Sequence, residues 1–318
     1  MIETIGNGWM WTGFIAFIGL MVAIDMLLLG RQGAHRVSAR EAGVWSLVWV
    51  ALALAFNAAL WWWLDGQLGR EIANQRALEF LTGYLVEKAL AVDNIFVFVL
   101  IFGYFAVPAE YQRRVLLYGV LGAIVLRAAM ILAGALLIAR FHWVLYLFGA
   151  LLVATGFKML LFADHAPDLA KNPVLRWLRG HLRVTDDYHG DRFTVRRDGV
   201  LWFTPLFLVL VMIEISDLVF AVDSIPAIYA ITTDPFIVFT SNMFAILGLR
   251  ALYFLLADMA QRFHLLKYGV ALVLVLIGAK MLLAELYKLP IGVALGLVAL
   301  ILAISVLASL WQARRQQP

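Results

Sequence analysis

The sequence contains no cysteine and little charge. Lys, Arg, Asp and Glu make up 14% of its 318 residues, whereas soluble domains carry about a quarter. The missing cysteine excludes disulfides, thiolate metal sites and cysteine nucleophiles, but leaves the redox compartment open. Instead, 64% of the residues are hydrophobic and the mean hydropathy is +0.90. This composition excludes disorder, collagen-like repeats and a water-soluble enzyme, and predicts a polytopic membrane protein of the all-α class.

Long apolar runs predict about nine transmembrane helices, because each reaches the length of about 20 residues that a spanning helix needs. The segments are 9–29, 42–64, 78–105, 115–138, 141–163, 204–230, 235–257, 264–286 and 290–311. Their connections are mostly short and polar, and the exception is 164–203. No cleavable signal peptide is expected, because the residues before the first segment include Glu3 and no basic residue.

The expected organisation has five parts. They are two N-terminal spans (1–77), a first three-span repeat (78–163), a basic cytoplasmic loop (164–203), a second three-span repeat (204–286), and a last span with a short tail (287–318).

The basic residues predict how the chain is oriented. An N-terminus outside the cell places sixteen of the 25 lysines and arginines in cytoplasmic connections and four outside, with the other five inside spans. The positive-inside rule therefore predicts an outside N-terminus and a cytoplasmic C-terminus in the plasma (inner) membrane. The same rule accounts for the net charge of +4, so the lipid bilayer is the expected partner and no nucleic acid is.

The long connection 164–203 contains sequence patterns that predict local structure. In 174–183, Leu175, Leu178 and Leu182 form one face and arginines surround it. This pattern predicts a short amphipathic helix that lies on the anionic inner leaflet. The alternative is a charged tether with little order.

The end of this connection predicts a β-hairpin. In 192–203, Asp198 and Gly199 stand between two β-prone runs, which is a hairpin signal. Thr204 and Pro205 then supply an N-cap and a first-turn proline for the sixth span.

The most informative feature is an internal repeat. Glu87–Asn94 and Asp217–Ser224 both read acid, five residues, Asp and a small polar residue, with Ala-Val before the Asp. Further matches follow in the same order: Leu126-Arg127-Ala128 with Leu249-Arg250-Ala251, Arg140-Phe141-His142 with Arg262-Phe263-His264, and Gly156–Leu161 with Gly278–Leu283. Each copy covers three spans, and an odd number forces opposite orientations. Inverted repeats are typical of secondary transporters, whose sites lie near the midplane where the repeats meet.

Acidic residues inside the spans are the candidate site. They are Asp25, Glu87, Asp93, Glu214, Asp217 and Asp223. Six such acids cost on the order of 15 kcal/mol before pairing, and such residues are functional candidates by default. The alternative is structural pairing with in-span bases, and Arg127 and Arg250 are deep enough to pair with some of these acids.

Helical geometry limits how the acids of the sixth span can act together. Glu214 and Asp217 share one face, whereas Glu214 and Asp223, nine residues apart, point in opposite directions. A continuous helix therefore cannot aim all three at one ion. Pro226 predicts a break, because it has no N–H for the carbonyl of Val222, and a broken helix would expose backbone oxygens beside Asp223. A plain proline kink is the alternative.

The available ligands favour hard cations. Without cysteine or a mid-span histidine, the spans offer carboxylate, amide, hydroxyl and carbonyl oxygens, which suit Mg²⁺, Ca²⁺ and Mn²⁺. Protons are an alternative, since buried carboxylates can titrate near neutral pH. Asn57, Asn94 and Ser224 are further candidate ligands, although buried polar residues more often join helices.

Three stretches resemble the TerC family of integral membrane proteins, and most closely its Alx-like branch. They are Glu87–Phe98, Glu214–Ala227 and Asp25–Gly30. The resemblance implies Mn²⁺ export from the cytoplasm, a link to tellurite resistance and a superfamily built on three-span inverted repeats. Carried over by matching position, it implies an ion path of Glu87, Asp93, Asn94, Glu214, Asp217, Asp223 and Ser224.

The resulting hypothesis is a secondary transporter that exports Mn²⁺ and exchanges it for protons at the same acids. It expects no prosthetic group and no enzymatic activity, and leaves the oligomeric state open. Asp25, Asn57, Arg127, Arg250 and Pro226 are its auxiliary or coupling residues. The alternative is a membrane-bound metalation or assembly partner for exported proteins, with the basic loop as its contact surface. An intramembrane aspartate enzyme ranks last, because the sequence shows no Gly-x-Gly-Asp signature, Ser-His arrangement or nucleotide loop.

Overall fold

The computed structural model describes residues 4–32, 37–161, 169–257, 265–284, 286 and 289–315. Almost all of its regular structure is helical. The helices are α1 (Gly8–Gln32), α2 (Ala39–Leu68), α3 (Arg70–Tyr104), α4 (Ala109–Arg140), α5 (Val144–Leu161), α6 (Pro173–His181), α7 (Pro205–Tyr229), α8 (Pro235–Leu247), α9 (Leu249–Leu256), α10 (Leu266–Leu282) and α11 (Ile291–Arg315), with a 3₁₀ turn η1 (Leu169–Lys171). Two strands, β1 (Thr194–Arg197) and β2 (Val200–Phe203), complete it.

A helix lies in each predicted segment, and α8 and α9 share one. Within the described ranges, six helices are long and apolar enough to cross a membrane: α2, α4, α5, α7, the α8–α9 pair and α11. Of the other three, α1 is apolar over Gly8–Ile24, α3 carries charged residues along its length, and α10 has 17 residues. The chain is therefore an all-helical polytopic membrane protein, and the spanning of α1, α3 and α10 stays a prediction.

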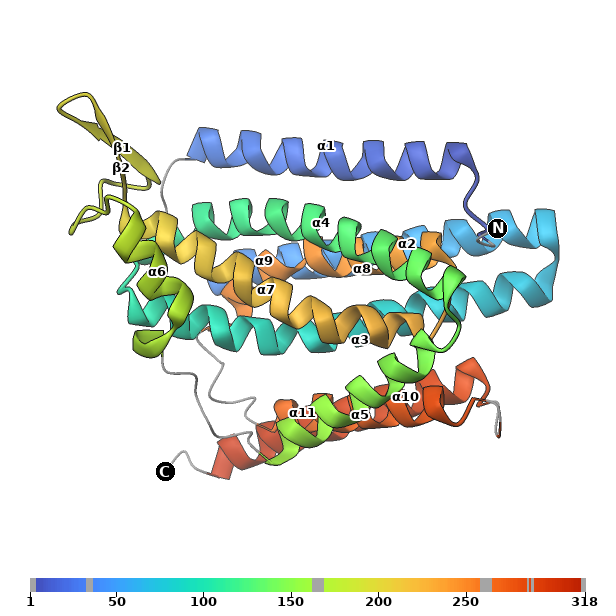
Figure 1. Cartoon of the computed structure of the whole chain (residues 1–318). Coiled ribbons are helices and arrows are strands. Elements are labelled where there is room, and N and C mark those ends of the chain that lie inside the picture. Colours follow the sequence, from blue (N-terminus) through green and yellow to red (C-terminus); the bar gives the residue numbers. More distant parts are fainter. Residues whose placement is uncertain are drawn as a thin grey trace.

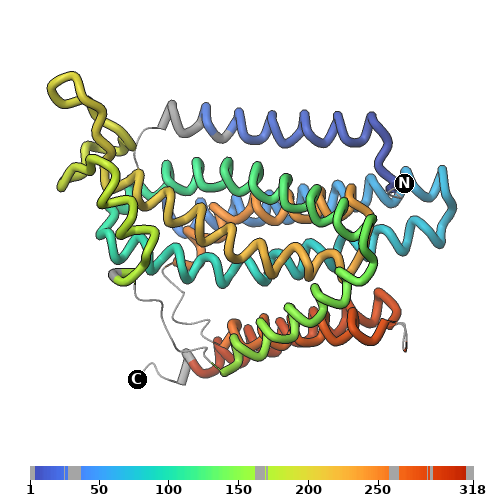
Figure 2. Tube along the Cα trace, viewed as in Figure 1, coloured from blue at the N-terminus to red at the C-terminus, as the bar shows by residue number. Residues whose placement is uncertain are grey.

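The long helices run roughly along one axis, so their connections gather at two ends (Figure 1). The end that carries α6 and the β1–β2 hairpin, here called the hairpin end, also holds the last turn of α11, and the N-terminus lies at the opposite end (Figure 2). Helices α5, α10 and α11 form a layer along one side of the bundle. Glycines allow α5 and α10 to touch: a Cβ on Gly278 would lie 2.7 Å from the carbonyl oxygen of Gly149.

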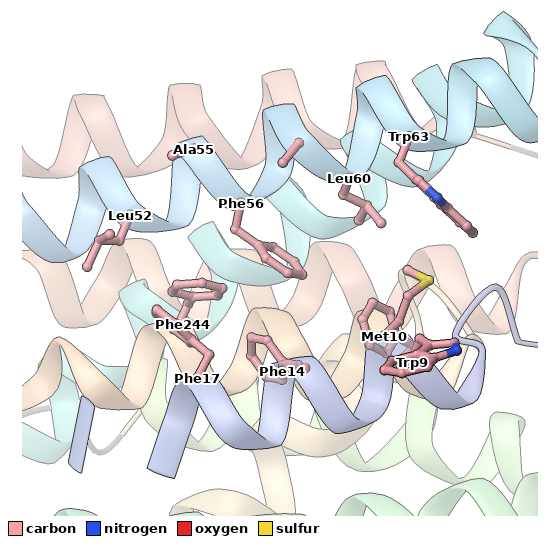
Figure 3. Close-up of a pocket in the computed structure, with 13 residues that line it drawn as sticks. Trp9, Met10, Phe14, Phe17, Leu52, Ala55, Phe56, Leu60, Trp63 and Phe244 are labelled. Carbon is pink, nitrogen blue, oxygen red and sulfur yellow. The ribbon is translucent and has the colours of Figure 1, made fainter. Parts of the chain in front are cut away.

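Helix α1 packs through aromatic rings on the other side of the bundle. Phe14 stacks near the rings of Phe56 and Phe244, with centroids 5.3 and 5.6 Å away. A groove of about 510 Å³ lies between α1 and α2, and its described lining is apolar, including Leu60 and Trp63 (Figure 3). This groove therefore lies apart from the charged residues of the bundle.

The predicted hairpin is confirmed. Strands β1 and β2 pair antiparallel, and the turn residues Asp198 and Gly199 have φ angles of 50° and 74°, the left-handed values that a tight hairpin turn needs. Thr204 and Pro205 precede and begin α7 as expected. The Thr204 hydroxyl, however, donates to the carbonyl of Arg192 at 2.7 Å and does not cap the helix.

The amphipathic helix is present as α6, but its predicted position on the lipid surface is wrong. Leu175 and Leu178 are 2% and 6% exposed, because they pack into a protein core with Phe102 of α3 and Met212 of α7. The Tyr188 hydroxyl also ties this region to the α3–α4 connection, donating to the carbonyl of Phe105 at 2.7 Å. Burial raises the pKa of Tyr188 to about 12, so the phenol stays a donor at neutral pH.

This position of α6 predicts a contrast between two faces of one short helix. Leu175→Ala is expected to lower the free energy of unfolding by about 2–5 kcal/mol, since it leaves a cavity in the core. Trp177→Ala, on the exposed face, is expected to change it by about 0.5 kcal/mol or less. Denaturant unfolding in detergent, followed by circular dichroism, measures both. Equal losses for the two variants would contradict the packed position.

Candidate functional site

Arg127 of α4 lies at the centre of the bundle and joins two acids from two other helices. Its Nη1 contacts Glu87 Oε1 of α3. Its Nη2 lies 2.9 Å from Asp217 Oδ1 of α7 and its Nε lies 3.2 Å from Asp217 Oδ2, which is a bidentate pair. Glu87, Arg127 and Asp217 are 1–3% exposed and stand close to the middle of their helices. The structure thus pairs a deep arginine with two of the predicted site acids.

Two neutral side chains complete this group, and they also come from the two copies of the repeat. Arg127 Nη1 donates to Ser224 Oγ at 3.1 Å, and Asn94 Nδ2 donates to Asp217 Oδ1 at 3.3 Å. Glu87, Asn94, Arg127, Asp217 and Ser224 are called the central cluster below. Matched positions of the two motifs therefore meet in one cluster: Glu87 and Asp217 bind the same guanidinium, Ser224 accepts a hydrogen bond from it, and Asn94 donates to Asp217.

Glu214 lies beside the central cluster, one helical turn before Asp217 on α7. Its carboxylate packs against Gly122 of α4, where an added Cβ would overlap it. Three buried oxygens here have no hydrogen-bond partner among the described residues: Glu87 Oε2, Asn94 Oδ1 and Glu214 Oε2. Unsatisfied buried acceptors are unusual, and they point to a missing cation or ordered water.

Asp93 and Asp223 are not part of the central cluster. Asp223 accepts a hydrogen bond from Thr155 of α5 at 2.9 Å, and Asp93 feels the charge of Lys267 of α10. Each is six residues from the acid that binds Arg127, and that spacing turns it by about 120° around the helix. The acid of each copy thus faces the third helix of the other copy.

In this conformation the seven predicted ligands form no single metal centre. Among the residues that the structure describes, no group of three or more Asp, Glu and His side chains is placed to hold a metal ion. Arg127 occupies the space between Glu87 and Asp217, where a cation could otherwise bind both.

The predicted break of the sixth span at Pro226 is wrong. Helix α7 continues through Pro226 to Tyr229, because the proline lies in its last turn and Ala230 N–H still bonds the Pro226 carbonyl at 3.0 Å. A break falls instead at Gly248, between α8 and α9. A Cβ there would overlap Lys88 Nζ, which donates to the Ala245 carbonyl at 3.4 Å.

The other predicted auxiliary residues, Asp25, Asn57 and Arg250, do not belong to the central cluster. Asp25 belongs to α1, but its side chain is outside the described residues. Asn57 of α2 is 8% exposed and lies in the helix that lines the apolar groove. Arg250, near the start of α9, lines a small cavity of about 10 Å³ together with Asp217.

Comparison with known proteins assigns the chain to a family. A sequence profile described as the integral membrane protein TerC family matches residues 72–317. The chain belongs to the TerC family. The match covers both motifs and hence the whole central cluster.

Other TerC proteins align with this one over nearly their full length. A protein of Escherichia coli strain K12, described as "Putative membrane-bound redox modulator Alx", is 56% identical over 310 residues, which are 98% of this chain and 97% of the relative. A protein of Photorhabdus laumondii with the same description is 53% identical over 98% of this chain and 97% of its own. An uncharacterized membrane protein of Myxococcus xanthus is 45% identical over 98% and 95%. No solved structure gives a significant match.

One buried acid of this TerC protein is not among the predicted site residues. Glu79 of α3 is 4% exposed, and its Oε2 accepts hydrogen bonds from Arg76 at 2.8 Å and from Thr232 at 2.7 Å. Gln75 donates to its other oxygen at 2.9 Å. Because both oxygens are satisfied, Glu79 joins α3 to the α7–α8 connection and is not a candidate ligand. Its place at the start of a predicted span made it look like a span-end residue.

Proposed function

We propose that this TerC protein is a secondary transporter that exports Mn²⁺ from the cytoplasm and exchanges it for protons. The observation that carries the proposal is the set of unsatisfied buried oxygens at the bundle centre: Glu87 Oε2, Asn94 Oδ1 and Glu214 Oε2. Oxygen ligands of this kind suit hard divalent ions such as Mn²⁺. Buried oxygens without a partner cost stability, and a bound cation would satisfy them.

The proposed architecture is nine spans with two inverted repeats, α3–α5 and α7–α10. Its support is that matched residues meet. Glu87 and Asp217 share Arg127, Ser224 accepts a hydrogen bond from Arg127, and Asn94 donates to Asp217. Sites of inverted-repeat transporters lie where the repeats meet, near the midplane. The proposed orientation has the hairpin end and the C-terminus in the cytoplasm, in the plasma (inner) membrane.

In this mechanism the guanidinium of Arg127 takes the place of the metal cation when no ion is bound. A guanidinium keeps its charge at any physiological pH, so it neutralises Glu87 and Asp217 when no ion is bound. Mn²⁺ binding requires Arg127 to release at least one of these carboxylates. The released oxygens, with those of Glu214 and Asn94, then bind the ion. Protons that return on the acids complete the exchange.

The alternative roles have less support. The name of the relatives speaks of redox modulation, but this chain has no cysteine and therefore no thiol chemistry of its own. For an assembly partner that docks through the basic loop, the leucine face of α6 is not available, because Leu175 and Leu178 are buried in the core of this chain. Trp177 and Leu201 stay exposed there.

The test is Mn²⁺ flux into proteoliposomes. We expect uptake of ⁵⁴Mn²⁺ to rise when the lumen is acidic, to fall when a protonophore collapses the gradient, and to be inhibited more by unlabelled Mn²⁺ than by Mg²⁺ or Ca²⁺. Protein-free liposomes set the background. Absence of Mn²⁺ flux under pH gradients of both directions would overturn the proposal.

A further inference from the structure

Two cavities lie in line between the hairpin end and Asp217. The outer one, about 360 Å³, is lined by residues near the hairpin-end termini of three helices, including Phe102 of α3, Gln112 of α4 and Tyr253 of α9. The inner one is the cavity of about 10 Å³ that Asp217 and Arg250 line. A cavity of that size holds about one water molecule. The inner cavity therefore brings solvent-sized space directly to a central carboxylate.

The wall between these cavities is one helical turn thick. Each of three helices contributes one residue to the outer lining and the residue four positions away to the inner lining. The three pairs are Phe102 and Phe98 in α3, Gln112 and Leu116 in α4, and Tyr253 and Leu249 in α9. Four residues advance a helix by about 6 Å, so a single layer of side chains separates the cavities.

That layer is tightly closed, and a hydrogen bond between two of its helices spans it. Phe98, Phe102, Leu116, Leu249 and Tyr253 are 2–4% exposed. The Tyr253 hydroxyl donates to Gln112 Oε1 at 2.9 Å, and Gln112 Nε2 donates to the Val107 carbonyl at 3.2 Å. The Tyr253 ring also meets Phe102 edge to face, with centroids 5.5 Å apart. The hydrogen bond thus joins α4 to α9 across the wall.

We propose that this wall is the gate through which a hydrated cation passes from the hairpin end to Asp217, and that the Tyr253–Gln112 hydrogen bond keeps it closed. Asp217 and Arg250 both line the inner cavity, so the route ends at a lining that carries an acidic as well as a basic residue. Opening requires α9 and α4 to separate at this contact. The identity of the ion rests on the proposed function, whereas the position of the gate does not.

Thiol labelling tests the gate, and the absence of native cysteine makes every introduced cysteine unique. Ala123→Cys places a thiol in the inner lining, where Ala123 is 3% exposed. A membrane-impermeant methanethiosulfonate reagent, added to the hairpin-end side of vesicles, is expected to react slowly with this variant. Adding Tyr253→Phe, which removes only the hydroxyl, is expected to speed the reaction at least tenfold. Val120→Cys in the same lining serves as a second position.

Two controls separate an opened gate from a loosened fold. Tyr229→Phe removes a phenol hydroxyl that donates to the Ile131 carbonyl at 2.6 Å, and neither residue lines either cavity, so it should leave the labelling of Ala123→Cys unchanged. Ala135→Cys, buried in α4 beyond the central cluster, should stay unlabelled in every background. Unchanged labelling of both inner positions in the Tyr253→Phe background, or equal acceleration at Ala135→Cys, would overturn the gate.

The same variants separate the gate from the proposed function. Accelerated labelling without any Mn²⁺ flux would keep the gate and reject Mn²⁺ transport. Flux that continues while Tyr253→Phe leaves labelling unchanged would keep the transporter and reject this gate.

Discussion

Replacing Arg127 by methionine is expected to abolish Mn²⁺ export and to lower the free energy of unfolding by about 3–5 kcal/mol. Methionine fills a similar volume but leaves the carboxylates of Glu87 and Asp217 buried without their shared partner. Breaking a buried ion pair from one side is costly because the remaining charge stays desolvated. Unfolding in detergent measures the stability, and ⁵⁴Mn²⁺ flux measures the export.

A triple variant distinguishes the structural role of Arg127 from its role in transport. Arg127→Met with Glu87→Gln and Asp217→Asn removes all three charges, so stability should largely return while export stays absent. Arg176→Met, on the exposed face of α6, is the matched control and should change neither property. Arg127→Met alone with native stability would contradict the observed pairing.

Most of the fold could be predicted because it depends on local properties of the chain. Apolar length places a helix in every predicted segment, and the Asp198-Gly199 turn predicts the hairpin at its observed position. The position of α6 could not be predicted in the same way. The leucines Leu175 and Leu178 show that one face seeks an apolar surface, but an amphipathic pattern is the same for a lipid surface and for a protein core.

The candidate site shows the same division between local and long-range information. The six-residue spacing already turns Asp93 away from Glu87, but which of them faces Arg127 depends on how α4 packs against α3 and α7. The break at Gly248 depends on Lys88, which is 157 residues distant from the carbonyl it binds. Pro226 predicts a break that does not occur. A proline in the last turn of a helix removes one backbone hydrogen bond there and leaves the helix continuous.

These long-range contacts join the two copies of the sequence repeat. Glu87 and Asp217 occupy matched positions and bind the same guanidinium, so a movement of Arg127 affects both carboxylates. Asp223 accepts a hydrogen bond from Thr155 of α5, and the charge of Lys267 of α10 acts on Asp93, so each lateral acid interacts with the opposite copy. The glycine contact of Gly278 with Gly149 then joins those two helices as one unit. For the inverted repeats proposed above, this arrangement would let one repeat rock against the other around the central cluster.

Glu214→Gln is expected to reduce Mn²⁺ export at least tenfold while the protein stays folded. The amide has nearly the shape of the carboxylate, and Glu214 Oε2 has no partner among the described residues, so the free energy of unfolding should change by about 1 kcal/mol or less. A metal ligand, however, loses its charge and one of its two oxygens. Asp186→Asn makes the same chemical change at an exposed position of the loop and should leave flux unchanged.

A second variant changes the position of this carboxylate without changing its charge. Gly122→Ala places a methyl group where the Glu214 carboxylate packs, so the side chain must move and export should fall. Gly296→Ala in α11 meets no atom within 4 Å and controls for the gain in helix propensity, about 1 kcal/mol, that Ala brings over Gly. Native flux in both Glu214→Gln and Gly122→Ala would remove Glu214 from the ion path. Loss of flux in these two with native stability would place the Glu214 carboxylate in the ion path.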